Sequence, residues 1–475
     1  MNIKTKNTKI VATLSDLRCD VDFIQKLFDA GMDVVRLNTA HQDEEGTLRV
    51  INNVRAVSDK IAIMLDTKGP EIRTCFLENP LLIVKDKEYV FSGNVSASLD
   101  NHIPTTYEGI VSDVPLNATI LVDDGYVAFK VIKKDSSGLH TVALNNGEVK
   151  NKKSINIPNI SINLPALTEK DKSFIRFAAR NNLDFIAHSF VRNKNDVNEV
   201  QKILDEEGSS IGIISKIENK EGVDNIQEII DESYGVMIAR GDLAIEIPAA
   251  QIPLLQKEII QKCLQSAKPV IVATQMLESM IKQPRPTRAE VSDVANAIID
   301  GASAIMLSGE TAYGDYPIEA VQTMSDVALD LHNRKAKICT AQLHLAQRGI
   351  SSEIAILAAE LATKVSAKAV IVPSITGKTA RVISAIRTRK PIFALCYDES
   401  TMRKLALSHG IRAGKIAEFH STDELVSGCI THLVDNGSLT STDLVVFLGG
   451  TVRGKPHRTN FLEVAVVSDI LEEYK

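Results

Sequence analysis

Two stretches of the chain decide the fold: IGIISKIE, residues Ile211–Glu218, and YGVMIARGD, residues Tyr234–Asp242. Each begins with a short apolar run that is typical of a buried strand and ends in charged residues. Because an unpaired charge is costly to bury, such a strand end must reach the surface or find a partner. When many parallel strands of one domain end this way, their ends form one charged mouth. In a barrel of alternating strands and helices, that mouth is the edge where catalytic groups gather.

The same pattern recurs along the first two-thirds of the chain, and the segments between the runs have helical spacing, as in Asp20–Ala30 and Asn219–Asp231. Eight strands alternating with helices predict a (β/α)8 TIM barrel in an α/β protein. An open doubly wound sheet is the alternative that the pattern alone leaves. The expected strands are Lys9–Leu14, Asp33–Asn38, Ile61–Asp66, Asp184–Ser189, Ile211–Lys216, Gly235–Arg240, Pro269–Thr274 and Ser303–Ser308.

Two regions depart from this alternation. After Glu71 the helical period is lost, and Asp124-Gly125 and Asn146-Gly147 separate β-rich runs, which indicates hairpins. From about Ala341 onward, apolar strands return with helices between them, and 475 residues are too many for one core. We predict a barrel of residues 1–70 and 154–340, an inserted small β-barrel domain of residues 71–153, and a C-terminal α/β domain of residues 341–475.

Composition narrows the class of protein. The net charge of −6 argues against general nucleic-acid binding, and the hydrophobic fraction of 44% supports large cores. No apolar run is long enough to span a membrane and no leader pattern is present, so a soluble, cytoplasmic protein is expected. The six cysteines form no C-x-x-C pair, which predicts reduced thiols, and no H-x-x-x-H pair suggests a zinc site.

Lys216, Glu218 and Asp242 form the most informative cluster of charges. Carboxylates without histidine or thiol partners favour a hard cation, Mg²⁺ or Mn²⁺. A structural ion-pair cluster is the alternative. We expect Gly241 to permit unusual φ angles in a sharp strand-to-helix turn. The helix start that follows offers N–H groups to a carboxylate or phosphate.

Six blocks of sequence, taken together and in order, resemble the pyruvate kinase family. They are Leu65–Arg73, Ile213–Asn219, Met237–Leu243, Ala273–Met280, Pro284–Glu290 and Leu307–Ala312. The resemblance implies transfer of the phosphoryl group of phosphoenolpyruvate to ADP, giving pyruvate and ATP, the final step of glycolysis. It also implies a homotetramer with the three-part architecture described above, in which the barrel is catalytic, the inserted domain is a lid and the C-terminal domain is regulatory.

The resemblance assigns roles to residues of the mouth. Glu218 and Asp242 would hold Mg²⁺ or Mn²⁺, while Lys216 and Arg36 would contact the transferring phosphoryl group. Thr274 would orient groups near the enolate carbon or relay a proton through water, because its hydroxyl is a poor acid. The implied catalytic residues are Lys216, Thr274 and Arg36, and the implied substrate-binding residues are Arg36, Lys216, Ala239, Gly241, Asp242 and Thr274.

The resemblance also implies nucleotide and potassium sites. Nucleotide contacts would come from Asn38, His41, Arg73 and Lys153, the last two at the limits of a closing lid. The implied K⁺ ligands are Asn38, Asp66 and Thr67. The chain departs from the family here: Ala40 stands where a serine commonly supplies an oxygen, whereas Glu71 is the acidic residue of K⁺-dependent members.

A second candidate site lies in the C-terminal region. Hydroxyls, a glycine and a helix start follow an apolar strand, which suits a phosphate cradle, although a plain surface turn is the alternative. By the resemblance, a sugar-phosphate or nucleotide effector would bind there. The residues of this site are Ser374, Thr376, Lys378, Thr379 and Arg453.

Two other functions are compatible with a charged barrel mouth. One is a Mg²⁺-dependent aldolase or lyase acting on phosphoenolpyruvate or pyruvate, which needs no nucleotide lid. The other is a non-catalytic metabolite sensor. The insertion between Arg73 and Lys153 argues against the first, and the presence of Lys216, Glu218, Asp242 and Thr274 together argues against the second.

Overall fold

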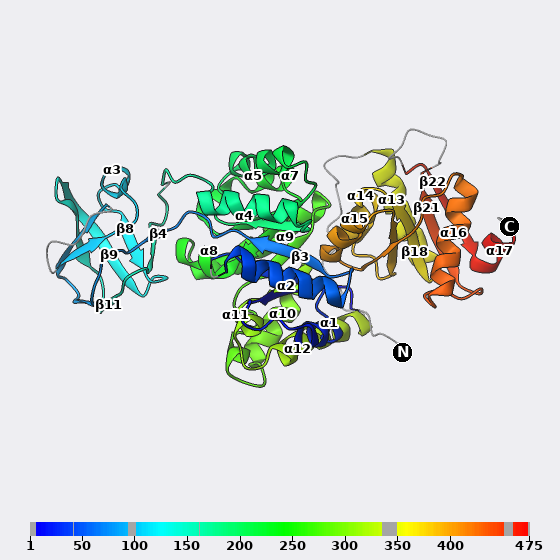
Figure 1. The fold of residues 1–475 in the computed structure, drawn as a ribbon, viewed down its shortest axis with the longest axis horizontal. Coiled ribbons are helices and arrows are strands. Elements are labelled where there is room, and N and C mark those ends of the chain that lie inside the picture. The colour runs from blue at the N-terminus through cyan, green and yellow to red at the C-terminus, as the bar shows by residue number, and fades with distance from the viewer. Residues whose placement is uncertain are drawn as a thin grey trace.

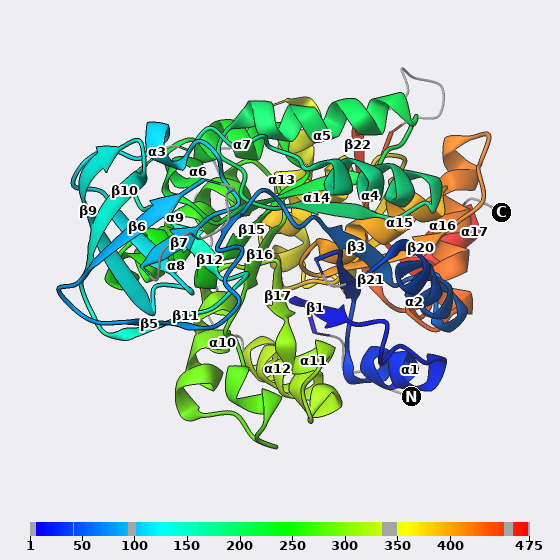
Figure 2. The ribbon, with the colours of Figure 1, turned by 60° about the vertical axis from the view of Figure 1, so that its left-hand side comes forward.

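The chain folds into three parts arranged along its long axis (Figure 1). The computed structural model describes residues 6–40, 42–93, 101–160, 162–334, 349–450 and 459–473. An inserted β domain lies at one end, a (β/α)8 barrel lies in the middle and an α/β domain lies at the other end. The same three parts are seen from another side in Figure 2, where the inserted domain comes forward.

Eight parallel strands close the barrel in the order β1-β17-β16-β15-β14-β13-β3-β2, which confirms the predicted TIM barrel and rules out an open sheet. Alternate residues of each strand face opposite sides: Phe185 and Ala187 lie in the barrel interior, whereas Ile186 packs outward against the helices. The strands are β1 (Lys9–Leu14), β2 (Val34–Asn38), β3 (Ala62–Asp66), β13 (Phe185–His188), β14 (Gly212–Ile217), β15 (Gly235–Ala239), β16 (Val270–Ala273) and β17 (Ala304–Leu307).

Helices cover the outside of the barrel, and their ends carry the expected caps. Thr168 and Asp171 form a capping box at the start of α4, and Gly31 ends α1 with a φ of 114°. The helical stretch predicted at Asn219–Asp231 is two helices that meet at Asn225. The helices are α1 (Val21–Ala30), α2 (Glu44–Val57), α4 (Glu169–Arg180), α5 (Lys194–Glu206), α6 (Lys220–Asp224), α7 (Ile226–Glu232), α8 (Arg240–Glu246), η1 (Ala249–Gln251), α9 (Ile252–Gln265), η2 (Glu278–Ile281), α10 (Arg288–Asp300), α11 (Gly309–Ala312) and α12 (Pro317–Asn333).

The inserted domain is a seven-stranded sheet in the order β4-β12-β8-β9-β10-β6-β7, with a separate pair β11-β5. Its two edge strands are joined, since Thr106 N–H donates to the Arg73 carbonyl and Cys75 N–H to the Pro104 carbonyl, so the sheet curls onto itself. Its elements are β4 (Ile72–Arg73), β5 (Leu81–Ile83), β6 (Glu88–Ser92), β7 (His102–Pro104), α3 (Ile110–Asp113), β8 (Thr119–Val122), β9 (Val127–Asp135), β10 (Gly138–Ala143), β11 (Gly147–Val149) and β12 (Ser154–Asn156). Strand β12 belongs to this sheet, although it begins at Ser154, one residue past the predicted end of the inserted domain. The limits given above for the three domains stay a prediction.

The C-terminal part is a five-stranded sheet in the order β20-β19-β18-β21-β22, with only β22 antiparallel. Helices cover both faces, with α13 and α14 on one and α16 and α17 on the other. Strand β20, which begins at Ile411, is not among the strands that the apolar runs of this region predict, which are Ala369–Pro373, Pro391–Tyr397, Leu444–Leu448 and Leu462–Val467. The elements are α13 (Ile350–Lys364), β18 (Ala369–Ser374), α14 (Lys378–Ala385), β19 (Ile392–Cys396), α15 (Glu399–Lys404), η3 (Leu405–Leu407), β20 (Ile411–Lys415), α16 (Thr422–Asp435), β21 (Leu444–Gly449), β22 (Phe461–Val466) and α17 (Val467–Glu473).

Two global features complete the fold. No helix in the described ranges is long and apolar enough to cross a membrane. The cysteines in those ranges, Cys19, Cys75, Cys263, Cys396 and Cys429, are all free thiols.

Candidate active site

The carboxyl ends of β2, β3 and β14 bring four charged side chains together at one mouth of the barrel. The Lys216 ammonium lies 3.1 Å from Oδ1 of Asp66 and 2.9 Å from Oε1 of Glu218, and it donates to Oγ of Ser189 at 2.8 Å. On the other side of Asp66, Nε of Arg36 donates to Oδ2 at 2.5 Å. Asp66 therefore pairs with both Arg36 and Lys216, and Lys216 pairs with both Asp66 and Glu218.

Burial and pairing act against each other in this cluster. Burial by itself lowers the pKa of Lys216, but Asp66 and Glu218 outweigh it, so the pKa is raised above its usual value. Burial raises the pKa of Asp66, yet Arg36 and Lys216 hold that pKa below its ordinary value. Lys216 is therefore a fixed positive charge, and Asp66 a fixed negative one, across the neutral range.

Glu218 and Asp242 form a pair of buried carboxyls at neighbouring strand ends. Burial is the main cause that raises the pKa of each, and it outweighs the opposing effect of Lys216. A divalent cation fits this pair, because it would neutralise both charges and meet only oxygen ligands. In the described part of the chain no group of three or more His, Cys, Asp or Glu side chains gathers as a metal site. Two protein carboxylates would leave coordination positions for substrate oxygens.

The end of β16 carries an unusual backbone. Thr274 and Gln275 have φ angles of 68° and 55°, in the left-handed region that β-branched residues avoid. Arg240 holds this segment: it donates to the Thr274 carbonyl at 3.0 Å and forms two 2.7 Å contacts with Asp293. The expectation of an unusual φ at Gly241 is wrong, because Gly241 lies inside helix α8 and has no positive φ.

The hydroxyl of Thr274 occupies the helix start that was expected to receive a substrate carboxylate. Gly241 N–H donates to Oγ1 of Thr274 at 2.8 Å, and that hydroxyl donates to the Ala273 carbonyl at 2.7 Å. Ala239 precedes this turn as the N-cap of α8. Thr274, Gly241 and Asp242 are thus brought together at the ends of β15 and β16.

Three contributors to the mouth were given no role by the sequence. Ser189 donates to the Thr67 carbonyl at 2.7 Å and accepts from Lys216. Phe190 has a φ of 56°, and its N–H donates to Oε2 of Glu218 at 2.7 Å. Asp293 holds Arg240 as described above. Only Ser189 carries a signal in the sequence, as a polar residue at a strand end; the roles of Phe190 and Asp293 depend on tertiary contacts.

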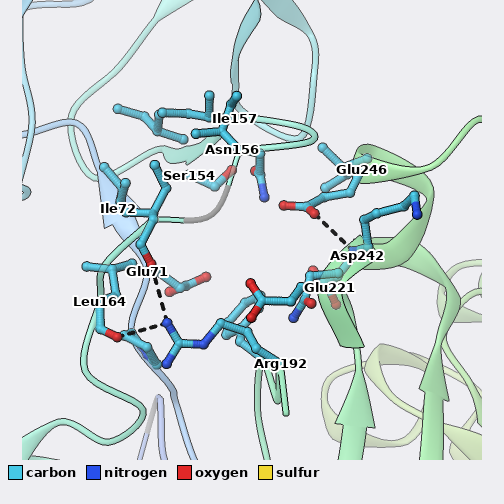
Figure 3. Close-up of a pocket in the computed structure, with 18 of the residues that line it drawn as sticks. Glu71, Ile72, Ser154, Asn156, Ile157, Leu164, Arg192, Glu221, Asp242 and Glu246 are labelled. Carbon is cyan, nitrogen blue, oxygen red and sulfur yellow. Dashed lines mark hydrogen bonds between the residues drawn. The ribbon is translucent and has the colours of Figure 1, made fainter. Parts of the chain in front are cut away.

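A cavity of about 650 Å³ opens between the inserted domain and the barrel beside this mouth (Figure 3). Glu71, Ser154 and Asn156 line it from the inserted domain and its connections, while Asp242 and Arg192 line it from the barrel. The volume lies within the range of small-molecule sites. Asp242 therefore faces a cavity large enough for an organic substrate.

Of the expected nucleotide contacts, Asn38, Arg73 and Lys153 can be placed, and His41 lies outside the described residues. Arg73 donates to Oε2 of Glu71 at 2.7 Å and to the Lys152 carbonyl at 2.7 Å. Lys153 pairs with Asp123 at 2.9 Å. The contacts of Arg73 and Lys153 thus lie in the inserted domain and its connection, whereas Asn38 lies at the barrel mouth.

Comparison with known proteins accounts for both the barrel and the C-terminal part. The description "Pyruvate kinase, barrel domain" matches residues 5–321, and "Pyruvate kinase, alpha/beta domain" matches residues 352–465. The chain belongs to the pyruvate kinase family.

The similarity to known pyruvate kinases extends over nearly the whole length of this chain. A pyruvate kinase of Borreliella burgdorferi is 47% identical over 473 residues, which are 98% of this chain and 99% of the relative. One of Bacillus licheniformis is 44% identical over 98% of this chain and 81% of its own. The crystal structure of a pyruvate kinase from Cryptosporidium parvum superposes with a TM-score of 0.89 at 34% identity, covering 97% of this chain and 96% of that one.

Membership in this family establishes the reaction. The chain is an enzyme that transfers the phosphoryl group of phosphoenolpyruvate to ADP, giving pyruvate and ATP. Pyruvate kinases generally require a divalent metal and K⁺. The aldolase and sensor alternatives are therefore set aside.

The residues expected to bind K⁺ lie on two adjacent strand ends, because Asn38 and Asp66 are register partners of β2 and β3 and Thr67 follows directly. Oδ1 of Asn38 accepts the N–H of Ala40 at 3.1 Å. Thr39, buried beside them, donates its hydroxyl to the Asp66 carbonyl at 2.9 Å. Thr39 thus places a side-chain oxygen next to the position where Ala40 has none.

The expected effector residues form a compact loop after β18. Oγ of Ser374 accepts the N–H of Gly377, whose φ is 72°, at 3.0 Å, and α14 begins at Lys378. Thr379 shares a 2.7 Å hydrogen bond with Thr459. Thr376 and Lys378 are exposed. Arg453, expected on the second loop, lies outside the described residues.

Proposed function

We propose that Lys216 is the central electrostatic residue of phosphoryl transfer in this enzyme, assisted by Arg36. The observation that carries the proposal is the burial of Lys216 among Asp66, Glu218 and Ser189, which holds its ammonium in one place. Phosphoryl transfer depends on positioning and charge neutralisation more than on covalent chemistry. A preorganised charge in a water-poor site stabilises the charge that develops on the phosphoryl and enolate oxygens.

Glu218 and Asp242 are the proposed ligands of Mg²⁺ or Mn²⁺. When bound, the cation supplies charge neutralisation to the substrate carboxylate and phosphoryl oxygens. The chain's own part is to hold Glu218 through Phe190 N–H and to present Asp242 to the cavity. The backbone after Ala239 would receive the substrate carboxylate once Thr274 releases Gly241 N–H.

Thr274 is proposed to orient groups near the enolate carbon or to relay a proton through water. Its backbone strain supports this role, because residues held in unfavourable φ regions tend to gather at functional sites. Its hydroxyl already lies between two backbone groups, so it can exchange partners without moving far.

ADP is proposed to bind between the barrel and the inserted domain, with contacts from Asn38, His41, Arg73 and Lys153. The cavity that separates the two domains supports this arrangement. Closure of the inserted domain would bring Arg73 and Lys153 towards the phosphates and exclude water.

K⁺ is proposed to bind at Asn38, Asp66 and Thr67. Clustering of three oxygen-bearing side chains on adjacent strand ends supports it. The Asp66 carboxylate is already shared between Arg36 and Lys216, so the protein would bind K⁺ weakly.

Regulation, assembly and location are further proposals. A sugar phosphate or nucleotide is proposed to bind at Ser374, Thr376, Lys378, Thr379 and Arg453. The family resemblance supports a homotetramer and a cytoplasmic location for the enzyme.

The test of the central proposal is Lys216→Met in an assay of pyruvate formation from phosphoenolpyruvate and ADP. We expect kcat to fall by about 10³ or more, by comparison with arginine fingers, while phosphoenolpyruvate still binds. Lys172→Met, which removes a half-buried lysine paired with Glu169 on the outer helix α4, is the control and keeps full activity. Circular dichroism checks that the variant folds. A tenth of the wild-type kcat in Lys216→Met would refute the central role.

A further inference from the structure

Arg387 is buried at the junction between the barrel and the C-terminal domain, just beyond α14, and is 5% exposed. Its guanidinium donates to the carbonyl oxygens of Gly301 and Ser384 and to the hydroxyl of Ser303, the last at 3.0 Å. Gly301 and Ser303 belong to the barrel, so this one side chain ties the two domains together. All of these acceptors are neutral.

A buried arginine is ordinarily paired with a carboxylate, because an uncompensated charge is costly away from water. Here burial lowers the pKa of Arg387 to about 9, and no carboxylate of the described residues offsets that effect. Four contacts account for at most four of the five N–H groups of the guanidinium. The charge and one donor are left without a matching anion.

A small cavity of about 10 Å³ lies against this guanidinium. Two more cations line it, Lys268 from the barrel and Arg381 from α14, and no lining residue carries a carboxylate. Ser408 also lines it; this residue is 2% exposed, and its hydroxyl is buried without a hydrogen-bond partner among the described residues. Its lining residues are Ala267, Lys268, Pro269, Ser303, Arg381, Ser384, Ala385, Arg387 and Ser408.

The hydrogen bonds of the two other cations also go to neutral groups, although Asp231 and Glu232 lie near enough to Lys268 to act on its pKa. The Lys268 ammonium donates to the Ser233 carbonyl at 2.6 Å, and burial lowers its pKa. Arg381 lies over the Tyr234 ring, 4.7 Å from its centre, and donates to the Tyr234 hydroxyl at 3.3 Å. The cavity is therefore positive on both its barrel side and its C-terminal side.

We propose that this cavity is a binding site for one small monatomic anion, such as chloride, held by Arg387 and the Ser408 hydroxyl across the domain junction. The volume admits a single occupant about the size of water. Water could satisfy the hydroxyl but would leave the positive charge uncompensated. A phosphate or a sugar phosphate is too large for the space.

The direct test is crystallography of the whole enzyme grown or soaked in sodium bromide. We expect an anomalous bromide peak in the cavity, within hydrogen-bonding reach of the Arg387 guanidinium and of Oγ of Ser408. Bromide peaks elsewhere in the crystal with only water in this cavity would overturn the proposal. A phosphate in the cavity, with no halide, would overturn it too.

A second test measures thermal unfolding in sodium chloride and in sodium gluconate at equal ionic strength. An anion that binds only the folded state raises the unfolding midpoint, here by about 2 °C or more in chloride. Ser408→Ala and Arg387→Met should lose this chloride increment. Ser325→Ala removes a buried serine hydroxyl of α12 that does not line this cavity, and this variant should keep the chloride increment. If Arg387→Met does not fold, Ser408→Ala decides; an undiminished increment in Ser408→Ala would refute the hydroxyl's part in the site.

Discussion

At the scale of single residues, strained backbone marks the mouth of the barrel. Thr274, Gln275 and Phe190 all have positive φ angles, although none is a glycine. Such residues cost about 1–3 kcal/mol each and persist only where their surroundings hold them. At Thr274 those surroundings are Arg240 and the Gly241 N–H. Gly241, which could adopt such angles freely, does not.

The metal site can be tested at the same scale. Glu218→Gln and Asp242→Asn each remove an anionic oxygen, so we expect both variants to need at least about tenfold more Mg²⁺ or Mn²⁺ for half-maximal activity. Activity titrated against metal concentration measures this. Glu232→Gln, an exposed change on α7, serves as the control. An unchanged metal requirement in both site variants would rule out the pair as the metal ligands.

Ala40 offers a test of the potassium site. We expect K⁺ to activate the enzyme with weak affinity, and Ala40→Ser to lower the K⁺ concentration for half-maximal activity by a few fold, because the serine restores an oxygen ligand. Thr39→Val should act in the opposite direction if the Thr39 hydroxyl contributes. Full wild-type activity with tetramethylammonium as the sole monovalent cation would show that the site is not used.

At the scale of elements, the strands of the barrel could be predicted because buried parallel strands are continuous apolar runs bounded by polar residues. The hairpin at Asp124-Gly125 was predicted for a similar local reason, and β8 and β9 do pair antiparallel across it. The hairpin predicted at Asn146-Gly147 is wrong, because β11 pairs with β5 and not with β10. Strand β20 lacked this signature: its sequence IRAGK is only partly buried, as suits an edge strand. Its place in the sheet comes from pairing with β19.

Asp33, just before β2, links neighbouring barrel strands and gives a pH-dependent test. Its Oδ2 accepts the Ile10 N–H at 2.9 Å and pairs with Lys6, and Lys9 lies 3.5 Å from Oδ1. Burial opposes the charge, but Lys6 and Lys9 outweigh burial and hold the pKa of Asp33 below its usual 3.8. A lowered pKa contributes stability that is present above 3.8 and is lost as pH falls below it.

We therefore expect Asp33→Asn to lower the unfolding midpoint by about 5 °C at pH 7, where the wild-type ion pairs are intact. The difference should shrink as pH falls below about 4, because the unfolded wild type then binds a proton that the folded protein, with its lower pKa at Asp33, does not yet bind. Asp29→Asn, an exposed change on α1, should match the wild type. A constant difference from pH 7 to pH 3.5 would show that Asp33 acts through packing alone.

At the scale of the whole molecule, the C-terminal domain is docked onto the end of the barrel opposite the mouth. Leu407 of η3 packs into the interior core of the barrel, and Arg403 donates to the buried Asp184 at 2.7 Å. Asp184 directly precedes β13, the strand that leads to Ser189 and Phe190. Strand β13 thus runs from the domain junction to the active site.

This connection gives the effector proposal a measurable consequence. If a phosphorylated metabolite binds near Lys378 and favours phosphoenolpyruvate binding, then phosphoenolpyruvate must tighten metabolite binding by the same factor, about 5- to 150-fold in typical cases. Calorimetry and steady-state kinetics with sugar phosphates and nucleoside monophosphates measure both. Lys378→Ala should abolish the response, whereas Lys364→Ala, at the exposed end of α13, should keep it. If none of the compounds binds, the effector proposal is wrong and the loop is a plain surface turn.

The sequence by itself determined the eight alternating strands and helices, the inserted β domain, the C-terminal α/β domain and the charged strand ends, because periodicity and turn residues are local properties. Closure of the eight strands into a barrel rather than an open sheet was decided by the tertiary structure. The sequence also brought Lys216, Glu218 and Asp242 to one edge, since parallel strands share their direction. Only the tertiary structure decided how these groups pair. In the closed barrel β3 pairs with β13, although the inserted domain separates these two strands in the sequence. This pairing places Asp66 between Arg36 and Lys216. The strain at Thr274 and the uncompensated charge of Arg387 likewise depend on neighbours far away in the chain, which no local pattern encodes.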